Sequence, residues 1–226
     1  MQGGRLLRHL RAHPRSDAAA AEGDRLETGG LQLELVEAAL PEVALAADGN
    51  EGYAREHLAQ LVALDEFGLG FLEQPFGADE WELATELAHA ASTPHCMDDS
   101  LHGMGEVRHA HHLGALGVLN VKAPRMGGAL AGRAAAAWAA ERGVPAFCGG
   151  LLDTGVGKLH ALALSTCQGF CLPADATPSA HHFVQDLVEP PVEMAAGLWR
   201  ASKAPGIGAE VDVERLRSEA SVRLVP

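Results

Sequence analysis

GFLEQPFGADEW, residues 70 to 81, is a short apolar run that ends in Glu73 and is interrupted at Pro75. Proline has no backbone N–H and cannot continue a strand, so the run predicts a buried strand that stops at a carboxylate. From Asp79 onward the apolar side chains have helical spacing, which predicts a helix directly after the strand. Outside this stretch the chain repeats the same pair of elements.

Strand and helix patterns alternate on both sides of Glu73 without a hairpin signal, so the predicted sheet is parallel. The predicted strands cover 43–48, 69–74, 94–99, 118–123 and 144–150, and the helices 55–68, 79–92, 104–117, 128–143 and 154–167. The polar strand ends Asp48, Glu73, Asp98 and Lys122 stand 25, 25 and 24 positions apart. Such even spacing favours a TIM-type (β/α) barrel over a doubly wound sheet.

The two ends of the chain fit this repeat less well. Residues 1 to 28 are rich in Arg and Ala, show no clear strand pattern, and are expected to form an irregular or weakly helical lead. Residues 29 to 226 are expected to form the barrel domain, with 169–175 as its last strand. This makes about six βα units, where a full barrel has eight. The predicted fold is therefore an α/β barrel that is incomplete at its N-terminal side.

Composition limits the partners of the chain. The formal net charge is −13, which argues against nucleic acid and anionic membranes. No apolar run reaches the ~20 residues that a membrane span needs. The four cysteines lack CxxC spacing, which favours a reduced, cytoplasmic setting. We expect a small molecule as the ligand, and exposed strand edges would allow a homo-oligomer.

The strand ends themselves predict a chemistry. The C-terminal ends of neighbouring parallel strands meet at one rim, so Asp48, Glu73 and Asp98 should converge there. Three carboxylates repel one another unless a cation lies among them, and hard oxygen ligands select Mg²⁺ or a related ion such as Mn²⁺. Lys122 would lie next to that ion and could act as a base, abstracting a proton α to a carboxylate. Taken singly, each residue could instead simply end a strand and cap the following helix.

Several motifs resemble the enolase superfamily, whose members use a Lys or His base with Mg²⁺. The closest resemblance is to the o-succinylbenzoate synthase and N-acylamino acid racemase branch of the muconate-lactonising subgroup. The matching strings are ADGN (47–50), FLEQP (71–75), PHCMDDS (94–100), NVKAPRMGG (120–128) and CGGLLDTGVG (148–157). The likeness extends from about residue 31 to 213. It implies a (β/α) barrel and a small carboxylate as substrate.

Position by position, the resemblance implies that Asp48, Glu73 and Asp98 bind the metal and that Lys122 is the catalytic lysine. Asp99 replaces a glutamate of the family pattern. The remaining residues implied to bind substrate or to support the ligands are Asn50, Asp99, Asn120, Arg125, Gly149 and Gly150.

One part of the family pattern has no counterpart here. The family carries a KxK pair on the second barrel strand, which should fall near residues 20 to 26, yet no lysine precedes Lys122. The capping domain that closes the site in this family is also expected to be absent. These departures predict impaired catalysis.

The activity implied by the resemblance is dehydration to o-succinylbenzoate, a step of menaquinone synthesis, and the alternative is racemisation of N-acylamino acids. A further alternative is a non-catalytic remnant that still binds the metal.

Overall fold

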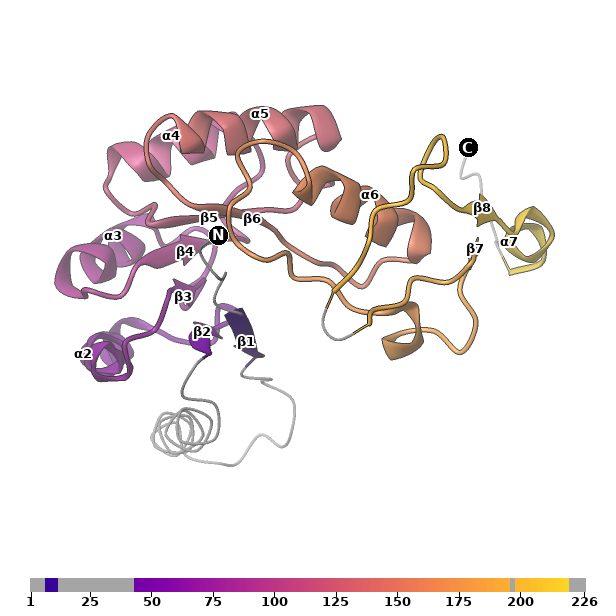
Figure 1. Cartoon of the computed structure of the whole chain (residues 1–226). Helices are drawn as coiled ribbons and strands as arrows, with labels where there is room; N and C mark the ends of the chain where they lie inside the picture. The colour runs from indigo at the N-terminus through magenta and orange to yellow at the C-terminus, as the bar shows by residue number, and fades with distance from the viewer. Residues whose placement is uncertain (1–6, 12–42, 196–197, 220–226) are drawn as a thin grey trace, which may run out of the picture.

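Six parallel strands of the computed structural model, which describes residues 7–11 (backbone), 43–195 and 198–219, form one sheet whose order follows the chain. They are β1 (Leu7–Arg11), β2 (Ala44–Asp48), β3 (Leu72–Glu73), β4 (His95–Met97), β5 (Val118–Val121) and β6 (Ala146–Cys148). After each of the strands β2 to β5, a helical segment leads the chain to the start of the next strand. These helices lie along the outside of the curved sheet (Figure 1). The predicted parallel α/β architecture is confirmed.

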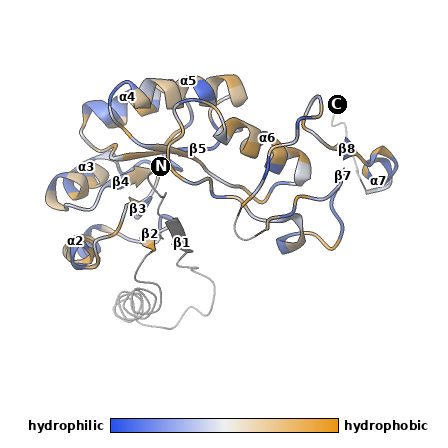
Figure 2. Cartoon of the chain, viewed as in Figure 1, coloured by the Kyte–Doolittle hydropathy of each residue, from blue (hydrophilic) through white to orange (hydrophobic). Residues whose placement is uncertain are grey.

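The helices follow the predicted pattern with shorter bounds. The described elements are η1 (Arg55–His57), α2 (Leu58–Ala63), η2 (Leu64–Phe67), α3 (Trp81–Ala90), α4 (Met104–His112), α5 (Ala129–Ala140), α6 (Gly155–Ser165), η3 (Ser179–His181) and α7 (Val213–Glu219). The first helical segment ends at Gly68, whose left-handed φ of 57° suits a residue without a side chain. Hydrophobic and hydrophilic residues are both present on each of these helices, as expected when one face packs on a sheet (Figure 2).

Small side chains let α4 and α5 approach the sheet closely. Ala110, Ala135, Ala136 and Ala139 are fully buried in the layer between these helices and the strands. Gly132 lies where a Cβ atom would come within 3.0 Å of the Val121 side chain. The alanine-rich sequence of α5 is therefore explained by close helix–sheet packing.

The concave side of the sheet is filled by side chains rather than open. Ala46, Phe71, Cys96, Val118 and Phe147 form one buried cluster there. The rings of Phe71 and Phe147 stack with centroids 5.4 Å apart. This cluster lies on the same strands that end in the polar residues, so it supports them from below.

The segment after α6 differs from the prediction. Residues 169–175 are not a regular strand, although Cys171 and Asp175 donate backbone hydrogen bonds to Ala146 and Cys148 of β6, both at 3.0 Å. Pro173 lies between them and has no N–H to donate, which interrupts the ladder.

The N-terminal prediction was wrong for residues 7–11, which form β1. β1 pairs in parallel with β2 from Leu7 opposite Ala44 to Arg11 opposite Asp48. The sequence LRHLR has neither an apolar run nor alternation, so only its pairing with β2 identifies it as a strand. The segment 20 to 26 and the boundary at residue 28 lie outside the described residues.

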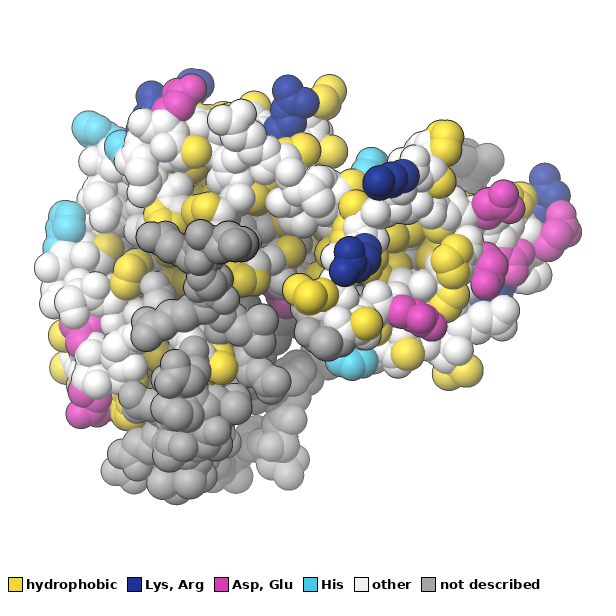
Figure 3. Space-filling model, in the orientation of Figure 1, with side chains coloured by type: hydrophobic (Ala, Val, Ile, Leu, Met, Phe, Trp, Pro, Cys, Tyr) yellow, Lys and Arg dark blue, Asp and Glu magenta, His cyan; other side chains and the backbone are white. Residues whose placement is uncertain are grey.

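The C-terminal part packs against α6. Strands β7 (Val188–Glu189) and β8 (Glu210–Val211) pair antiparallel, and Val188 and Val192 bury apolar surface with Leu159 and Leu162 of α6. Acidic side chains gather on the surface of this part, around β8 and α7 (Figure 3). Within the described ranges, no helix is long and apolar enough to cross a membrane.

Replacing Phe147 by alanine should lower the free energy of unfolding by about 3–5 kcal/mol, because the buried ring leaves a cavity beside Phe71. Urea unfolding measures this change. Leu152, which is exposed, provides the control: Leu152→Ala should stay within about 0.5 kcal/mol of the unmutated chain. Equal effects of the two substitutions would contradict the packed interior.

Candidate active site

The three predicted carboxylates lie at the C-terminal ends of adjacent strands. Asp48 ends β2, Glu73 ends β3, and Asp98 follows β4 directly. Only 7%, 3% and 4% of these three residues is exposed, respectively. Burial first, and then the charges of the three carboxylates, raise the pKa of Cys96 on β4. The three carboxylates therefore lie at the predicted strand ends, each near enough to the Cys96 thiol to affect its pKa.

Asp98 is held by two cations. Lys122, which follows β5, forms a charged hydrogen bond to Asp98 Oδ2, and Arg125 Nη1 donates to Asp98 Oδ1 at 3.1 Å. Arg125 also pairs with Asp99, the neighbouring acid. Burial raises the pKa of Asp98 to about 7, and Glu73 adds to the rise, whereas Lys122 opposes it. Burial thus opposes the charged form of Asp98, and the Lys122 ammonium group favours it.

Glu73 is held by an amide. Asn120 Nδ2 on β5 donates to Glu73 Oε1 at 2.6 Å, across the intervening strand β4. Both residues are buried. The structure thus brings together Asn120 and a predicted metal ligand.

The chain turns sharply after β2. Asn50 has a φ of 44°, a left-handed value that asparagine tolerates better than most residues. Its backbone N–H donates to Asp48 Oδ1 at 3.0 Å, whereas its side chain is exposed. In this arrangement the backbone of Asn50, rather than its amide group, supports the carboxylate.

Gln74 was missed as a site residue in the sequence, where it is only a polar residue between Glu73 and a proline. Its side chain is 2% exposed and joins the loops after β3 and β4. Oε1 accepts hydrogen bonds from the Asp98 and Ser100 backbone N–H groups at 3.0 and 3.3 Å, and Nε2 donates to the Phe76 carbonyl at 2.9 Å. Its φ of 32° is unfavourable for a residue with a side chain, so these bonds have to hold it. The signal available in the sequence is the polar residue flanked by the strand end and Pro75.

Comparison with known protein families identifies one that matches most of this chain. Residues 18–216 match the family described as enolase C-terminal domain-like. The chain belongs to the enolase superfamily. The resemblance inferred from the motifs is thereby confirmed.

Two relatives of this enolase-superfamily chain carry different activities in their names. The o-succinylbenzoate synthase of Geobacillus kaustophilus is 41% identical over 177 residues, covering 78% of this chain and 47% of that protein. The N-succinylamino acid racemase of Thermus thermophilus is 39% identical over 179 residues, covering 79% of this chain and 48% of that protein. The chain therefore spans about half the length of the curated relatives it matches.

Solved structures agree on the fold. A crystal structure of an enolase-superfamily member from Listeria innocua has a TM-score of 0.80 at 26% identity, covering 95% of this chain and 61% of that one. A muconate cycloisomerase from Pseudomonas fluorescens has a TM-score of 0.81 at 20% identity, covering 94% of this chain and 57% of that one. The second likeness shows the fold alone.

Members of the enolase superfamily use Mg²⁺, and the donor set here fits such an ion in its chemistry. Asp48, Glu73 and Asp98 supply hard, buried oxygen atoms at the ends of neighbouring strands, and such atoms are the ligands that Mg²⁺ prefers. Within the part of the chain that the structure describes, no three acidic, histidine or cysteine side chains are close enough together to hold an ion. The carboxylates would therefore have to move closer together around a cation.

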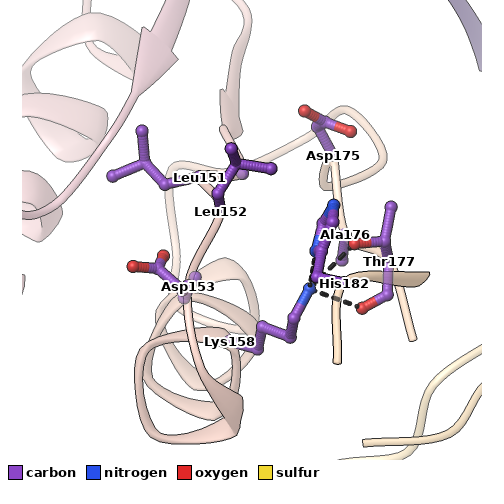
Figure 4. Close-up of a pocket in the computed structure, with 10 residues that line it drawn as sticks. Leu151, Leu152, Asp153, Lys158, Asp175, Ala176, Thr177 and His182 are labelled. Atoms are coloured by element: carbon purple, nitrogen blue, oxygen red, sulfur yellow. Dashed lines mark hydrogen bonds between the residues drawn. The ribbon is translucent and has the colours of Figure 1, made fainter. Parts of the chain in front are cut away.

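A second lysine is buried beside the strand ends, in a cavity between the loop after β6 and residues 175–182 (Figure 4). Lys158 on α6 donates to the Thr177 carbonyl and hydroxyl oxygens at 3.2 and 2.9 Å and to His182 Nδ1 at 3.0 Å. Burial lowers its pKa. All three of its N–H groups have partners, and the cavity measures about 50 Å³, where ligand pockets have about 300–1,000 Å³. Lys158 therefore ties the C-terminal segment to α6 and is not a second catalytic lysine.

The raised pKa of Asp98 predicts a pH-dependent stability. In the folded, cation-free protein, burial raises the pKa of Asp98 to about 7 from its ordinary value of 3.8. Since the folded state binds more protons between these values, the contribution of Asp98 to the free energy of unfolding should fall as pH rises through this range. Unfolding temperatures in EDTA from pH 5 to pH 8 measure it, with Asp98→Asn as the comparison. If the variant shows the same slope as the unmutated chain, the assignment to Asp98 is wrong.

Proposed function

We propose that this chain forms the barrel portion of an enzyme that abstracts a proton α to a carboxylate, with o-succinylbenzoate synthase-like dehydration as its reaction. The observation that carries the proposal is the buried pairing of Lys122 with Asp98, next to Glu73, at the ends of three adjacent strands. A lysine at this place can exchange a proton with a substrate carbon or stabilise negative charge on it.

The residues at the rim would have different roles in this reaction. Lys122 would face the reacting carbon, and Asp98 would hold its ammonium group in place. Arg125 bridges Asp98 and Asp99, which fixes the loop after β5 at the rim. Gly149 and Gly150 follow β6 and lie against the Asn120 amide and the Asp175 backbone, respectively, so neither position has room for a side chain.

We further propose that Asp48, Glu73 and Asp98 would hold a Mg²⁺ ion. When bound, the ion would supply positive charge that stabilises the charge developing on the substrate carboxylate. It would also offset the mutual repulsion of the three carboxylates.

Dehydration removes a proton and a hydroxyl group, giving water and o-succinylbenzoate. By resemblance, Lys122 would stabilise the developing charge while a group on the opposite face takes the proton. Racemisation of an N-acylamino acid is the second candidate, because one of the relatives is named N-succinylamino acid racemase. Racemisation needs proton exchange on both faces, and no lysine precedes Lys122 in the chain. Dehydration also needs a group opposite Lys122, so we expect weak turnover of either kind by this chain alone. Dehydration is favoured because the more similar of the two relatives is named o-succinylbenzoate synthase.

Calorimetric titration with Mg²⁺ tests the metal ligands. The unmutated chain should bind the ion, and Asp98→Asn should weaken binding by at least about tenfold, because a charged oxygen ligand is lost. Glu86 is exposed on α3, so Glu86→Gln is the control and should bind as the unmutated chain does. Absence of binding to the unmutated chain would defeat the metal proposal.

Turnover assays with both substrate classes test the lysine. Lys122→Ala should lower whatever rate the chain has by about 10²–10⁴-fold, the usual range for loss of a proton-transfer group. Lys203, an exposed lysine, provides the matched control Lys203→Ala. A Lys122→Ala variant with an unchanged rate would contradict the role of this residue. A rate of about 10 s⁻¹ or more in the unmutated chain would contradict the expected weakness.

A further inference from the structure

The side-chain amide of Asn120 has a hydrogen-bonded nitrogen and an oxygen without a hydrogen-bond partner among the described residues. Its Nδ2 donates to Glu73 Oε1 at 2.6 Å, and because a carboxylate only accepts hydrogen bonds, this contact fixes which end of the amide is nitrogen. Its Oδ1 is buried and has no hydrogen-bond partner among the described residues. A buried acceptor without a partner costs about 1–3 kcal/mol, so the fold holds this amide in place against a penalty.

Gly149 explains why the amide can take this position. A Cβ atom at residue 149 would lie 2.0 Å from Asn120 Oδ1 and 2.9 Å from its Nδ2. The backbone of Gly149 cannot easily withdraw, since its N–H donates to the Val121 carbonyl at 3.1 Å. Gly149 does not have a positive φ, so backbone conformation does not require a glycine here. A glycine is required instead because a side chain at position 149 would overlap the Asn120 amide.

From this geometry we infer that Asn120 is a positioning residue, which holds the Glu73 carboxylate for the metal through an amide that only a glycine at position 149 admits. The inference rests on the proposed function, because Glu73 is a ligand only if the site binds a cation. It links three neighbouring parts of the sheet: Glu73 at the end of β3, Asn120 in β5 and Gly149 after β6. The orientation of the Glu73 carboxylate thus depends on Asn120 and, through the space for its amide, on Gly149.

A positioning role and a merely structural role for Asn120 predict different effects of its loss on Mg²⁺ affinity. If the amide only filled space, its loss would lower the stability of the fold and leave the Mg²⁺ affinity of folded protein unchanged. If it positions Glu73, its loss should weaken Mg²⁺ binding by about 10–100-fold, the range found when partners of metal ligands are removed. Mg²⁺ affinity measured well below the unfolding temperature separates the two roles.

The experiment is a double-mutant cycle read by calorimetry with Mg²⁺ alone. Asn120→Ala and Gly149→Ala should each weaken binding by about 10–100-fold. The double variant should bind within about twofold of Asn120→Ala, because the added methyl group then meets no amide. Gly105→Ala is the matched control, since a Cβ atom there meets nothing within 4 Å.

Hydrogen exchange of the side-chain amide gives a second readout that needs no metal. Asn50 and Asn120 are the two asparagines of the chain, so labelling asparagine with ¹⁵N yields two side-chain signals. In cation-free protein the buried Asn120 amide should exchange at least about tenfold more slowly than the exposed Asn50 amide. Gly149→Ala should remove that protection, and Gly105→Ala should not.

The possible outcomes separate the inference from the proposed function. Mg²⁺ binding by the unmutated chain that changes less than twofold in Asn120→Ala overturns the inference alone. So do additive losses in the double variant, or an Asn120 amide that exchanges as fast as that of Asn50. No Mg²⁺ binding by the unmutated chain overturns the proposed metal site and the inference together. Protection of the amide, weakened binding in both single variants and no further loss in the double variant support it.

Discussion

The charged hydrogen bond between Lys122 and Asp98 joins the ends of two neighbouring strands at a place from which water is nearly excluded. Only 11% of the Lys122 side chain and 4% of the Asp98 side chain is exposed. Charges buried to this extent are costly unless each has a partner, and removing one partner of such a pair typically costs about 3–5 kcal/mol. The remaining polar groups at the rim are arranged so that this pair and the neighbouring carboxylates keep their partners.

The support for the rim comes from amides. Gln74 holds the backbone before and after Asp99, and Asn120 holds the Glu73 carboxylate. Amides can donate to carboxylates and accept from backbone N–H groups without adding charge to a site that already contains three acids. The apolar cluster that includes Phe71 and Phe147 lies beneath them and keeps the strands at fixed spacing. A rigid base under a charged rim is the arrangement that a preorganised site requires.

The C-terminal segment has a structural task in this arrangement. Lys158 donates all three of its hydrogen bonds to residues 177 and 182, and Asp186 accepts the Gly155 N–H at the start of α6 at 2.8 Å. Backbone hydrogen bonds then extend the contact to β6, which precedes Gly149 and Gly150. The second buried lysine of the chain therefore stabilises the scaffold next to the site and leaves Lys122 as the lysine at the rim.

Local patterns were sufficient to predict the parallel α/β fold and the strand ends at or directly after which Asp48, Glu73, Asp98 and Lys122 stand. The residues next to a strand in the sequence show where it ends. Neighbouring parallel strands then have their C-terminal ends at the same edge of the sheet. Pairings between distant residues were not predictable in this way. β1 has no strand pattern of its own and forms only by pairing with β2.

The same limit applies to the side chains of the site. The Asn120–Glu73 bond spans 47 positions, and the need for glycine at 149 follows from the position of an atom 29 residues earlier. Residue types and short-range spacing show which groups can reach the rim. Which groups touch depends on strand curvature and packing, because hydrogen bonds form or fail within a few tenths of an ångström, and only the folded chain determines distances that closely.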